Sequence, residues 1–210
     1  MKIKSITVTL LAPMNDHAAN RGEKLLGNAS SIKRRPDGRV YISGQMQRHV
    51  LFSAVDRLNQ DDPNGKGTYV ANGDGPSTNV AKDLRSDLGG YLDTNKDDYS
   101  GRRTAPVTAT PGVALQPSQV GRDLLVRLKM NEDRDAGRKQ ALATNEYSQA
   151  DLMLMSFHLD VAAVGVTKLF EYGDREAHLS TSYLDHLKDS PYERNRRVRL
   201  FLEATRSLTD

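Results

Sequence analysis

The sequence contains no cysteine and no tryptophan, and the absence of cysteine excludes whole classes of protein. Without cysteine there is no disulfide framework, no thiol nucleophile and no cysteine-ligated metal or iron–sulfur centre. Aromatic residues make up only 6% of the 210 residues and apolar residues 37%, whereas charged residues reach 27%. This composition predicts a modest core with long polar loops or arms. No apolar run approaches the length of a membrane span, so we expect no membrane partner.

The first residues resemble a secretory signal only superficially. Two lysines precede an apolar stretch, but Ile6, Val8 and Leu10 alternate with other residues, two of them threonines. This period of two indicates a strand, and the threonines interrupt the continuous apolar segment that a signal needs. We therefore expect a strand over residues 2–11 and a cytoplasmic protein.

The net charge of +3 hides a segregation of charge along the chain. Between residues 21 and 57, eight basic residues stand against three acidic ones, whereas residues 61–98 hold eight aspartates and four basic residues. Five more arginines lie between 194 and 206. A basic first third beside an acidic middle is typical of a protein with a polyanionic partner. An ordinary solvated surface is the alternative explanation of the same counts.

Residues 32–42 predict a β-hairpin that leads into a helix. The turn is Pro36-Asp37-Gly38, in which proline presets φ and glycine accepts a positive φ. Ser43 is typical of an N-cap, so we expect a helix from there to about residue 59. The arms of the hairpin carry four basic residues, namely Lys33, Arg34, Arg35 and Arg39.

Hydrophobic periodicity assigns two faces to this helix. The expected inward stripe is Met46, Val50, Leu51, Ala54, Val55 and Leu58. The expected exposed stripe is Gln45, Arg48, His49 and Phe52. A basic ribbon leading into a helix N-terminus suits a phosphodiester backbone, because guanidinium groups and free amides both bind phosphate oxygens. The alternative, a solvated hairpin and a capped helix, explains Ser43 but not the crowding of basic residues.

Beyond this helix the chain is expected to alternate between loops and strands. A polar loop is predicted over 12–31 and an inserted lobe over 61–103, where glycines and prolines are frequent. Further extended segments are expected at 104–119, 122–130 and 151–161. This irregular alternation of strands and helices favours an α+β fold with a mostly antiparallel sheet.

The last strand and the last helix each have an expected core face. Alternate residues of 151–161 would be buried, namely Met153, Met155, Phe157, Leu159 and Val161. A final helix over about 192–208 would turn its arginines outward. Its expected inward residues are Val198, Phe201, Leu202, Thr205 and Leu208.

Catalytic and metal-binding patterns are sparse. His158 and Asp160 lie two apart on the outer face of a predicted strand, where they could act as acid and base or be hydrogen-bonded surface residues. No third partner can be named for them, and no nucleophile elbow, zinc-binding or nucleotide fingerprint occurs. We therefore expect no cofactor and no metal.

The segment from residue 20 to residue 49 resembles a known family. It contains Asn20-Arg21-Gly22, then Gly27-Asn28, then Ile32-Lys33-Arg34, and finally Y-I-S-G-Q-M-Q-R-H from Tyr41 to His49. This string strongly resembles the backbone subunit of CRISPR Cascade complexes, in the branch called the DevR autoregulators. The basic hairpin, the S-G-Q-M and the R-H occur in register, and residues 25–58 carry most of the resemblance.

The resemblance implies a modified RRM-like (ferredoxin-like) palm, an inserted helical fingers lobe and an extended thumb hairpin. Residues 1–60 and 104–210 would form the palm and thumb, and residues 61–103 the fingers. Copies of the subunit would line up head to tail along one CRISPR RNA, beside other Cascade subunits, and present the guide for pairing with target DNA. The implied role is RNA-guided defence or transposition, without catalysis.

Residues of the matching segment would bind the RNA. Phosphate contacts are expected from Arg21, Lys33, Arg34 and Arg48, and phosphate or ribose contacts from Asn20, Ser43 and Gln45, with Arg35 and His49 completing the set. The alternative is a related backbone subunit that cuts RNA with a loop carboxylate. The candidate for that role is Asp16, because turn geometry alone explains Asp37.

Members of the family usually continue past the last helix into a glycine-rich segment and a closing strand. This sequence ends at Asp210. We therefore expect either a truncated product or a part of a longer chain.

Overall fold

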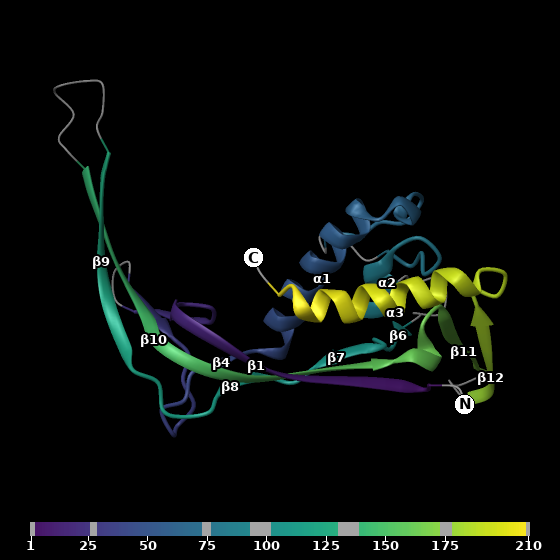
Figure 1. The fold of residues 1–210 in the computed structure, drawn as a ribbon, viewed down its shortest axis with the longest axis horizontal. Helices are drawn as coiled ribbons and strands as arrows, with labels where there is room; N and C mark the ends of the chain where they lie inside the picture. Colours follow the sequence, from purple (N-terminus) through teal and green to yellow (C-terminus); the bar gives the residue numbers. More distant parts are fainter. Residues whose placement is uncertain are drawn as a thin grey trace. The chain divides into compact units, whose positions relative to one another are not determined.

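The computed structural model describes residues 3–25, 29–72, 77–92, 102–129, 139–172 and 178–208. Its helices are α1 (Gly44–Asp61), α2 (Leu84–Gly89) and α3 (Pro191–Arg206), with 3-10 turns η1 (Pro63–Gly65) and η2 (Val161–Ala163). The first strands are β1 (Ser5–His17), β2 (Arg21–Leu25), β3 (Ala29–Ile32), β4 (Tyr41–Ile42), β5 (Tyr91–Leu92) and β6 (Arg102–Arg103). The later strands are β7 (Val107–Ala109), β8 (Gly112–Ala114), β9 (Val120–Lys129), β10 (Lys139–Asp160), β11 (Val166–Tyr172) and β12 (His178–Asp185). Figure 1 follows the chain through these elements.

The long strand β10 organises the main sheet. It pairs with β1, β3, β7, β8 and β9, and the sheet continues from β3 to β2 and from β8 to β4. The pairings with β7, β8 and β9 are antiparallel, whereas β3 runs parallel to β10. The predicted α+β class with a mainly antiparallel sheet is therefore confirmed, and the arrangement is consistent with an RRM-like palm.

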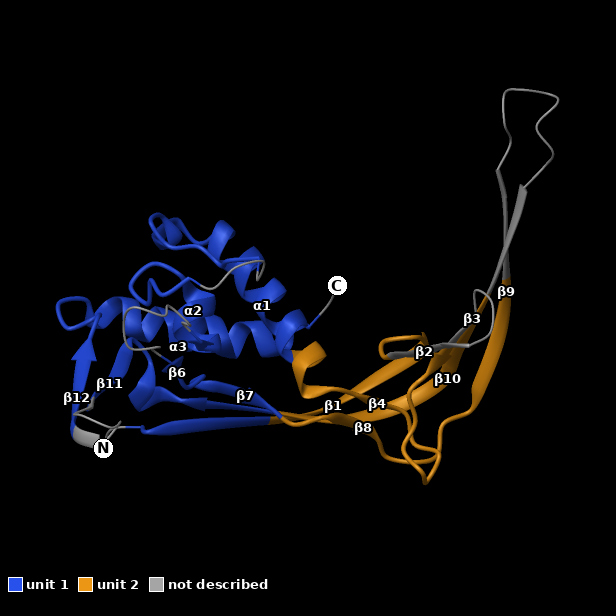
Figure 2. Cartoon of the chain, turned by 180° about the vertical axis from the view of Figure 1, so that it is seen from behind, with its two compact units in different colours: residues 1–8, 48–109, 157–210 blue, residues 9–47, 110–156 orange. Residues whose placement is uncertain are grey.

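The chain divides into two compact units, which are coloured separately in Figure 2. Unit 1 comprises residues 1–8, 48–109 and 157–210, and unit 2 comprises residues 9–47 and 110–156. Three elements, β1, α1 and β10, contribute residues to both units. The predicted division into palm, thumb and fingers is a different partition of the chain and stays a prediction.

Alternation along β10 is as the sequence predicts up to Leu159, whereas Val161, which was expected to be buried, begins η2 and is half-buried. Met153 and Met155 are buried in unit 2, and Phe157 and Leu159 are buried in unit 1. The first half of β10 forms a long antiparallel hairpin with β9, with pairs running from Lys139 opposite Lys129 to Ser148 opposite Val120. Most of the predicted charged turn at 131–140 lies outside the described residues.

The predicted loop over 12–31 is wrong. Strand β1 continues to His17, and β2 and β3 pair with each other. Burial alternates along most of β1, as in a strand covered on one face only. Pairing with β10 supplies the backbone hydrogen bonds, so a polar sequence with little intrinsic strand preference is nevertheless held extended.

The core face of α1 differs from the predicted stripe at one important position. Leu51, Ala54 and Val55 are buried as expected, but Phe52, which was expected to be exposed, is only 4% exposed. The guanidinium carbon of Arg85 lies 5.4 Å from the centre of the Phe52 ring and helps to cover it. A residue outside the helix therefore decides this burial, and the periodicity of the helix could not show it.

The face of α3 also departs from expectation. Phe201 and Thr205 point inward, but Leu202 is 38% exposed, while Arg196 and Arg197 are 2% and 0% exposed. The prediction that the arginines face outward is therefore wrong for these two. Each is buried because side-chain or backbone oxygens from distant segments, together with Glu193 of the same helix, surround its guanidinium group.

A buried ion cluster, formed by Asp87, Arg103 and Arg197, joins the elements of unit 1. The Asp87 carboxylate accepts hydrogen bonds from Arg103 Nη2, from Arg197 Nη1 at 2.6 Å and from the backbone amide of Gly165 at 2.8 Å. Arg197 also donates to Glu193 at 2.8 Å. Helix α2, strand β6 and helix α3 thus meet at one carboxylate that has no exposure to solvent.

Replacing this carboxylate should destabilise the protein strongly. Asp87→Asn keeps the shape but leaves Arg103 without an acidic partner in the described chain. Breaking a buried pair costs about 3–5 kcal/mol, so the free energy of unfolding in urea should fall by that amount. Glu203→Gln is the control, because its pair with Arg199 is exposed on both sides and is worth at most about 1 kcal/mol. Equal effects of the two substitutions would contradict the assignment.

Candidate nucleic-acid interface

The predicted hairpin is present in unit 2, with a tight turn. The amide of Gly38 donates to the carbonyl of Arg35 at 2.9 Å, which closes a four-residue β-turn with Pro36 and Asp37 at its centre. Gly38 then adopts a φ of 81°, the left-handed conformation that glycine adopts without strain. Arg34 pairs with Val40 across the ribbon. The sequence prediction of hairpin and turn is confirmed.

Two hydrogen-bonded side chains fix the returning arm of the hairpin. The amide of Val40 donates to Ser118 Oγ at 3.1 Å, and Ser118 Oγ donates to Asp151 Oδ1 at 2.6 Å. The other carboxylate oxygen of Asp151 lies 2.7 Å from His17 Nε2, at the end of β1. This buried chain connects the hairpin to both β1 and β10.

Two further buried side chains hold the ends of the hairpin. Glu146 of β10 accepts the amide of Ile32 at 3.1 Å and the Nε of Arg122 at 3.0 Å. Asn20, which is buried, donates from Nδ2 to the carbonyl of Tyr41 at 2.5 Å. The backbone of the hairpin is therefore anchored at Ile32, Val40 and Tyr41.

The anchoring carboxylates are stabilised in their charged form. Burial alone would raise the pKa of Asp151, but hydrogen bonds from Ser118, Ser148 and His17 outweigh it and hold that pKa below its ordinary value. The same balance lowers the pKa of Glu146, where the Ile32 amide and Arg122 overcome the effect of burial.

The start of α1 adjoins the hairpin and is capped as predicted. The amide of Met46 donates to Ser43 Oγ at 3.2 Å. Gln47 is buried and donates from Nε2 to the carbonyl of Thr110 at 2.7 Å, and a side chain at Gly112 would collide with it. The amides of Gly44 and Gln45 lie in the first helical turn, where no intrahelical acceptor exists.

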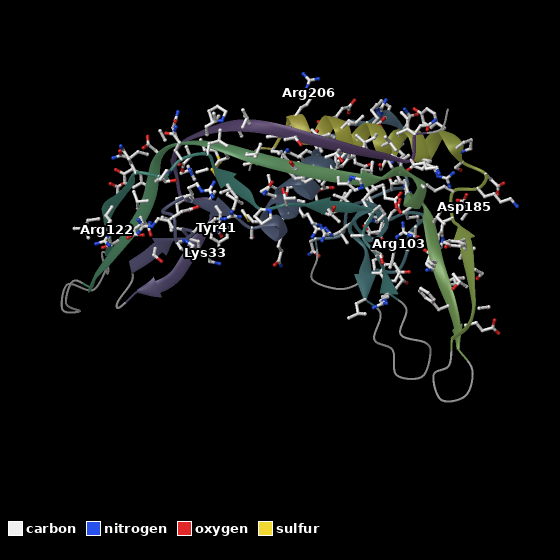
Figure 3. All side chains as sticks on the ribbon, turned by 90° about the horizontal axis from the view of Figure 1, so that it is seen from below. Lys33, Tyr41, Arg103, Arg122, Asp185 and Arg206 are labelled. Carbon is white, nitrogen blue, oxygen red and sulfur yellow. The ribbon has the colours of Figure 1, made fainter. Side chains whose placement is uncertain are left out.

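Three cations of the hairpin form no ion pair within the described part of the chain. Arg39 is paired, because its Nε lies 2.7 Å from Asp37 Oδ2 and holds the pKa of that carboxyl below its ordinary value. Lys33 and Arg34 are exposed and Arg35 is half-buried, and none of the three has an ion pair with a described acidic residue. Figure 3 shows Lys33 beside Tyr41, whose amide donates to the carbonyl of Lys33 at 3.5 Å.

The other predicted RNA-binding residues differ in their exposure and in the unit to which they belong. Gln45 and His49 are exposed on α1, and His49 belongs to unit 1. Asn20 is turned to the backbone of the hairpin, so its direct contact with RNA stays a prediction. The side chain of Arg21 lies outside the described part of the chain.

The expected position of Arg48 on an exposed stripe is wrong. Its side chain is half-buried in unit 1, where Nη2 donates to the carbonyl of Gly89 at 2.6 Å. The reason is again a contact with the segment that follows η1, which helix periodicity does not reveal. Arg48 therefore links α1 to the end of α2.

The candidate catalytic residues of the sequence have structural contacts. Asp16 has a φ of 46° at the end of β1, a left-handed conformation in which aspartate is enriched. His158 Nδ1 lies 2.9 Å from Thr7 Oγ1. Asp160 caps η2 by accepting the amides of Ala162 and Ala163. His158 and Asp160 are thus each engaged in a hydrogen bond of the fold.

Periodicity could have revealed one of the anchors that the sequence analysis missed. Asp151 has the same parity as Met153 and Met155, so it falls on the core face of the strand, where a carboxylate needs partners. Glu146, Ser118 and His17 carry no such signal, because their roles depend on segments far away in the sequence.

Comparisons with known proteins identify the family. The family model described as "CRISPR-associated negative auto-regulator DevR/Csa2" matches residues 8–209. The chain belongs to this family. No curated protein matches the chain.

None of the helices in the described ranges has the combined length and apolar character needed to cross a bilayer.

Two solved structures share the fold. One is a chain of a "CRISPR RNA-guided surveillance complex", with 12% identity and a TM-score of 0.50, covering 95% of this chain and 59% of that one. The other is a chain of a "CRISPR RNA-guided surveillance complex, pre-nicking", with 12% identity and a TM-score of 0.51, covering 95% and 68%. The chain thus spans about three fifths of the length of the first.

Acid should weaken the anchoring of the hairpin. Because the pKa of Asp151 is lowered by folding, its contribution to stability is present above its unfolded pKa of about 4 and is lost as the pH falls through the lower folded value. The free energy of unfolding should decrease below about pH 4, and the decrease should be shallower in Asp151→Asn. Asp123→Asn, an exposed aspartate of β9, is the control for urea titrations between pH 3 and pH 6. Parallel pH profiles of Asp151→Asn and the wild type would refute this role.

Proposed function

We propose that this DevR/Csa2 family member is an RNA-binding backbone subunit of a CRISPR Cascade effector complex. In this role it binds CRISPR RNA, lies head to tail with further copies beside other Cascade subunits, and presents the guide for pairing with target DNA. Family membership and the fold shared with chains of RNA-guided surveillance complexes support the assignment.

One observation carries the proposal, namely three neighbouring hairpin cations that form no ion pair with a described acidic residue. Lys33, Arg34 and Arg35 lie within three consecutive positions of a ribbon whose turn and backbone are fixed by buried hydrogen bonds. Like charges held close together repel each other, and a bound polyanion would relieve that repulsion. The adjoining first turn of α1 adds backbone amides, which are good phosphate ligands.

This arrangement suits a backbone contact better than a reading of sequence. Cations and amides bind phosphate oxygens, which are identical at every nucleotide. In RNA-guided recognition, base pairing between guide and target supplies the sequence information, and the protein has only to hold the guide backbone. A subunit that holds phosphates and leaves bases free satisfies this requirement.

Removing a hairpin cation should change the salt dependence of RNA binding. Each phosphate contact releases about one counterion, so the slope of log affinity against log salt should flatten by about one unit in Lys33→Ala and in Arg34→Ala. The slope is measured by fluorescence anisotropy with CRISPR RNA over a range of salt concentrations. Lys188→Ala, an exposed lysine of unit 1, controls for the change in net charge. An unchanged slope in both hairpin variants would remove the hairpin from the interface.

We also propose that the subunit binds RNA without cutting it. Incubation with complementary labelled RNA and Mg²⁺ should leave the RNA intact, both with the wild type and with Asp16→Ala. Regularly spaced fragments that appear with the wild type and disappear with Asp16→Ala would favour the catalytic alternative, because a loop carboxylate would then be the group on which cleavage depends.

A further inference from the structure

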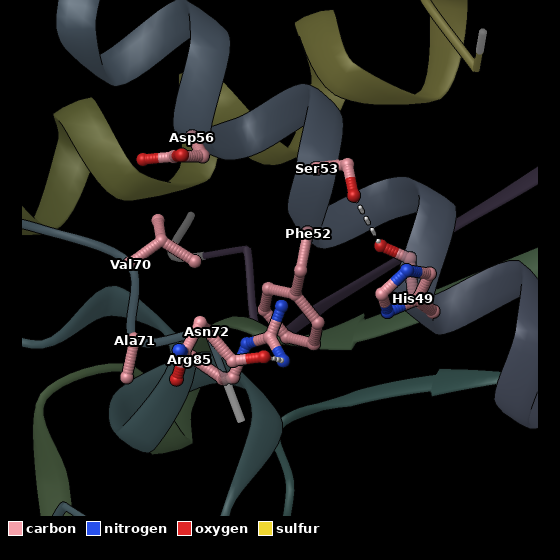
Figure 4. Close-up of a pocket in the computed structure, with 8 residues that line it drawn as sticks. All are labelled: His49, Phe52, Ser53, Asp56, Val70, Ala71, Asn72 and Arg85. Carbon is pink, nitrogen blue, oxygen red and sulfur yellow. Dashed lines mark hydrogen bonds between the residues drawn. The ribbon is translucent and has the colours of Figure 1, made fainter. Parts of the chain in front are cut away.

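A small cavity in unit 1 lies outside the hairpin. It has a volume of about 240 Å³ and opens between α1 and the segment that precedes α2, as Figure 4 shows. His49, Phe52 and Asp56 line it from α1, and Val70, Asn72 and Arg85 line it from the other side. Because all of these residues belong to unit 1, the cavity is a feature of that unit alone.

The wall of the cavity includes a flat, fixed cation. The Arg85 guanidinium lies over the Phe52 ring, 5.4 Å from its centre, and its Nη1 donates to the carbonyl of Asn72 at 3.1 Å. Figure 4 shows the two side chains lying across each other. A guanidinium stacked on an aromatic ring presents a planar surface on which another planar group can stack.

The cavity is lined by a cation, Arg85, by a carboxylate, Asp56, and by neutral polar side chains. The pKa of the nearby Arg48 is lowered by burial and by the charge of Arg85. The Nε atoms of both arginines are buried without a hydrogen-bond partner in the described chain. The carboxylate of Asp56, which also accepts Gln60 Nε2 at 3.0 Å, offers an acceptor at the wall. His49 adds an exposed imidazole.

The size of the cavity limits the ligand. A cavity of roughly 150 Å³ holds benzene, whereas drug-sized ligands occupy about 300–1,000 Å³. A volume of about 240 Å³ therefore suits one planar heterocycle and is too small for a peptide side chain together with its backbone. A bare phosphate would leave the guanidinium plane of Arg85 unused and would meet the charge of Asp56, so an aromatic heterocycle with both donors and acceptors fits best.

We propose that this cavity binds one unpaired base of a single-stranded nucleic acid, stacked against the Arg85–Phe52 pair. The inference rests on the proposed function, because a nucleic acid bound to the chain is what would bring a base to this surface. RNA and single-stranded DNA carry the same ligand chemistry, and the experiment distinguishes them. Bases with an exocyclic amino group should bind better than uracil, because Asp56 accepts from such a group.

The direct test uses free nucleosides with the isotope-labelled full chain. Cytidine and guanosine should shift the backbone amide signals of His49, Asn72 and Arg85 in a saturable manner, and uridine should do so more weakly. Ribose 5-phosphate and inorganic phosphate should leave these signals unchanged. Equal shifts with phosphate alone would identify an anion site and overturn the proposal, as would the absence of any shift with nucleosides.

A variant series separates stacking from folding. Arg85→Ala should weaken nucleoside binding roughly tenfold, the size of one lost stacking contact, and Arg85→Lys should restore it only in part. Lys82→Ala is the matched control, because it removes an exposed cation three residues away. Thermal unfolding verifies that each variant is folded. Wild-type affinity for nucleosides in a folded Arg85→Ala protein would contradict the proposal.

Oligonucleotides then identify the strand and keep the two proposals apart. Short RNA and DNA single strands, each with a matched abasic version, are titrated against the wild type and Arg85→Ala. The strand that carries bases should bind Arg85→Ala more weakly than the wild type, and the abasic strand should bind both equally. The nucleic acid, RNA or DNA, whose affinity depends more on its bases is the one that supplies the base. If RNA binds with the expected salt dependence but nucleosides do not, the cavity assignment fails and the proposed function stands. If nucleosides bind and RNA does not, the proposed function fails.

Discussion

The Asp87 carboxylate is the contact on which the helical part of unit 1 depends. It is fully buried, and guanidinium groups from Arg103 and Arg197 and the amide of Gly165 donate to it. A carboxylate that has lost its water must recover every hydrogen bond from the protein, so the donors have to be in place together. The segment that the sequence presents as an insertion is therefore tied to α3 and to the core through Asp87.

Unit 2 also contains buried carboxylates that need hydrogen-bond donors, but here they hold the hairpin and not the helices. Asp151 and Glu146 are also buried carboxylates, but the groups that satisfy them include Ser118, which holds the Val40 amide, and the backbone of Ile32 in the hairpin. The hydrogen bonds to these carboxylates fix the backbone of the hairpin before any ligand binds. A ribbon that is already ordered loses little conformational entropy on binding, which favours affinity for a given number of contacts. The cations of the hairpin are thus presented by a rigid frame.

Local signals in the sequence were sufficient for some elements and insufficient for others. The turn at Gly38, the cap at Ser43 and the alternation of Met153 and Phe157 depend on neighbouring residues, and the structure agrees with each. The burial of Arg197 and Phe52 depends on partners from other segments, which a hydropathy pattern cannot show. Periodicity counts arginine as polar and places it outside. A buried guanidinium is a favourable choice only when carboxylates converge on it, and convergence is a property of the fold.

Whether an arginine has an acidic partner in the fold also decides where the charge of the protein can act on a binding partner. The arginines of α3 look in the sequence like a basic cluster, yet Arg194 pairs with Asp185 and Arg199 with Asp62. Two others, Arg196 and Arg197, are buried. A paired cation contributes little to the field outside the protein, because its partner cancels most of it within a Debye length. The hairpin is different, because Arg39 is its only cation with an ion pair among the described residues. The electrostatic surface offered to a polyanion therefore follows the unpaired cations at Lys33 and Arg34 rather than the counts of arginine along the chain.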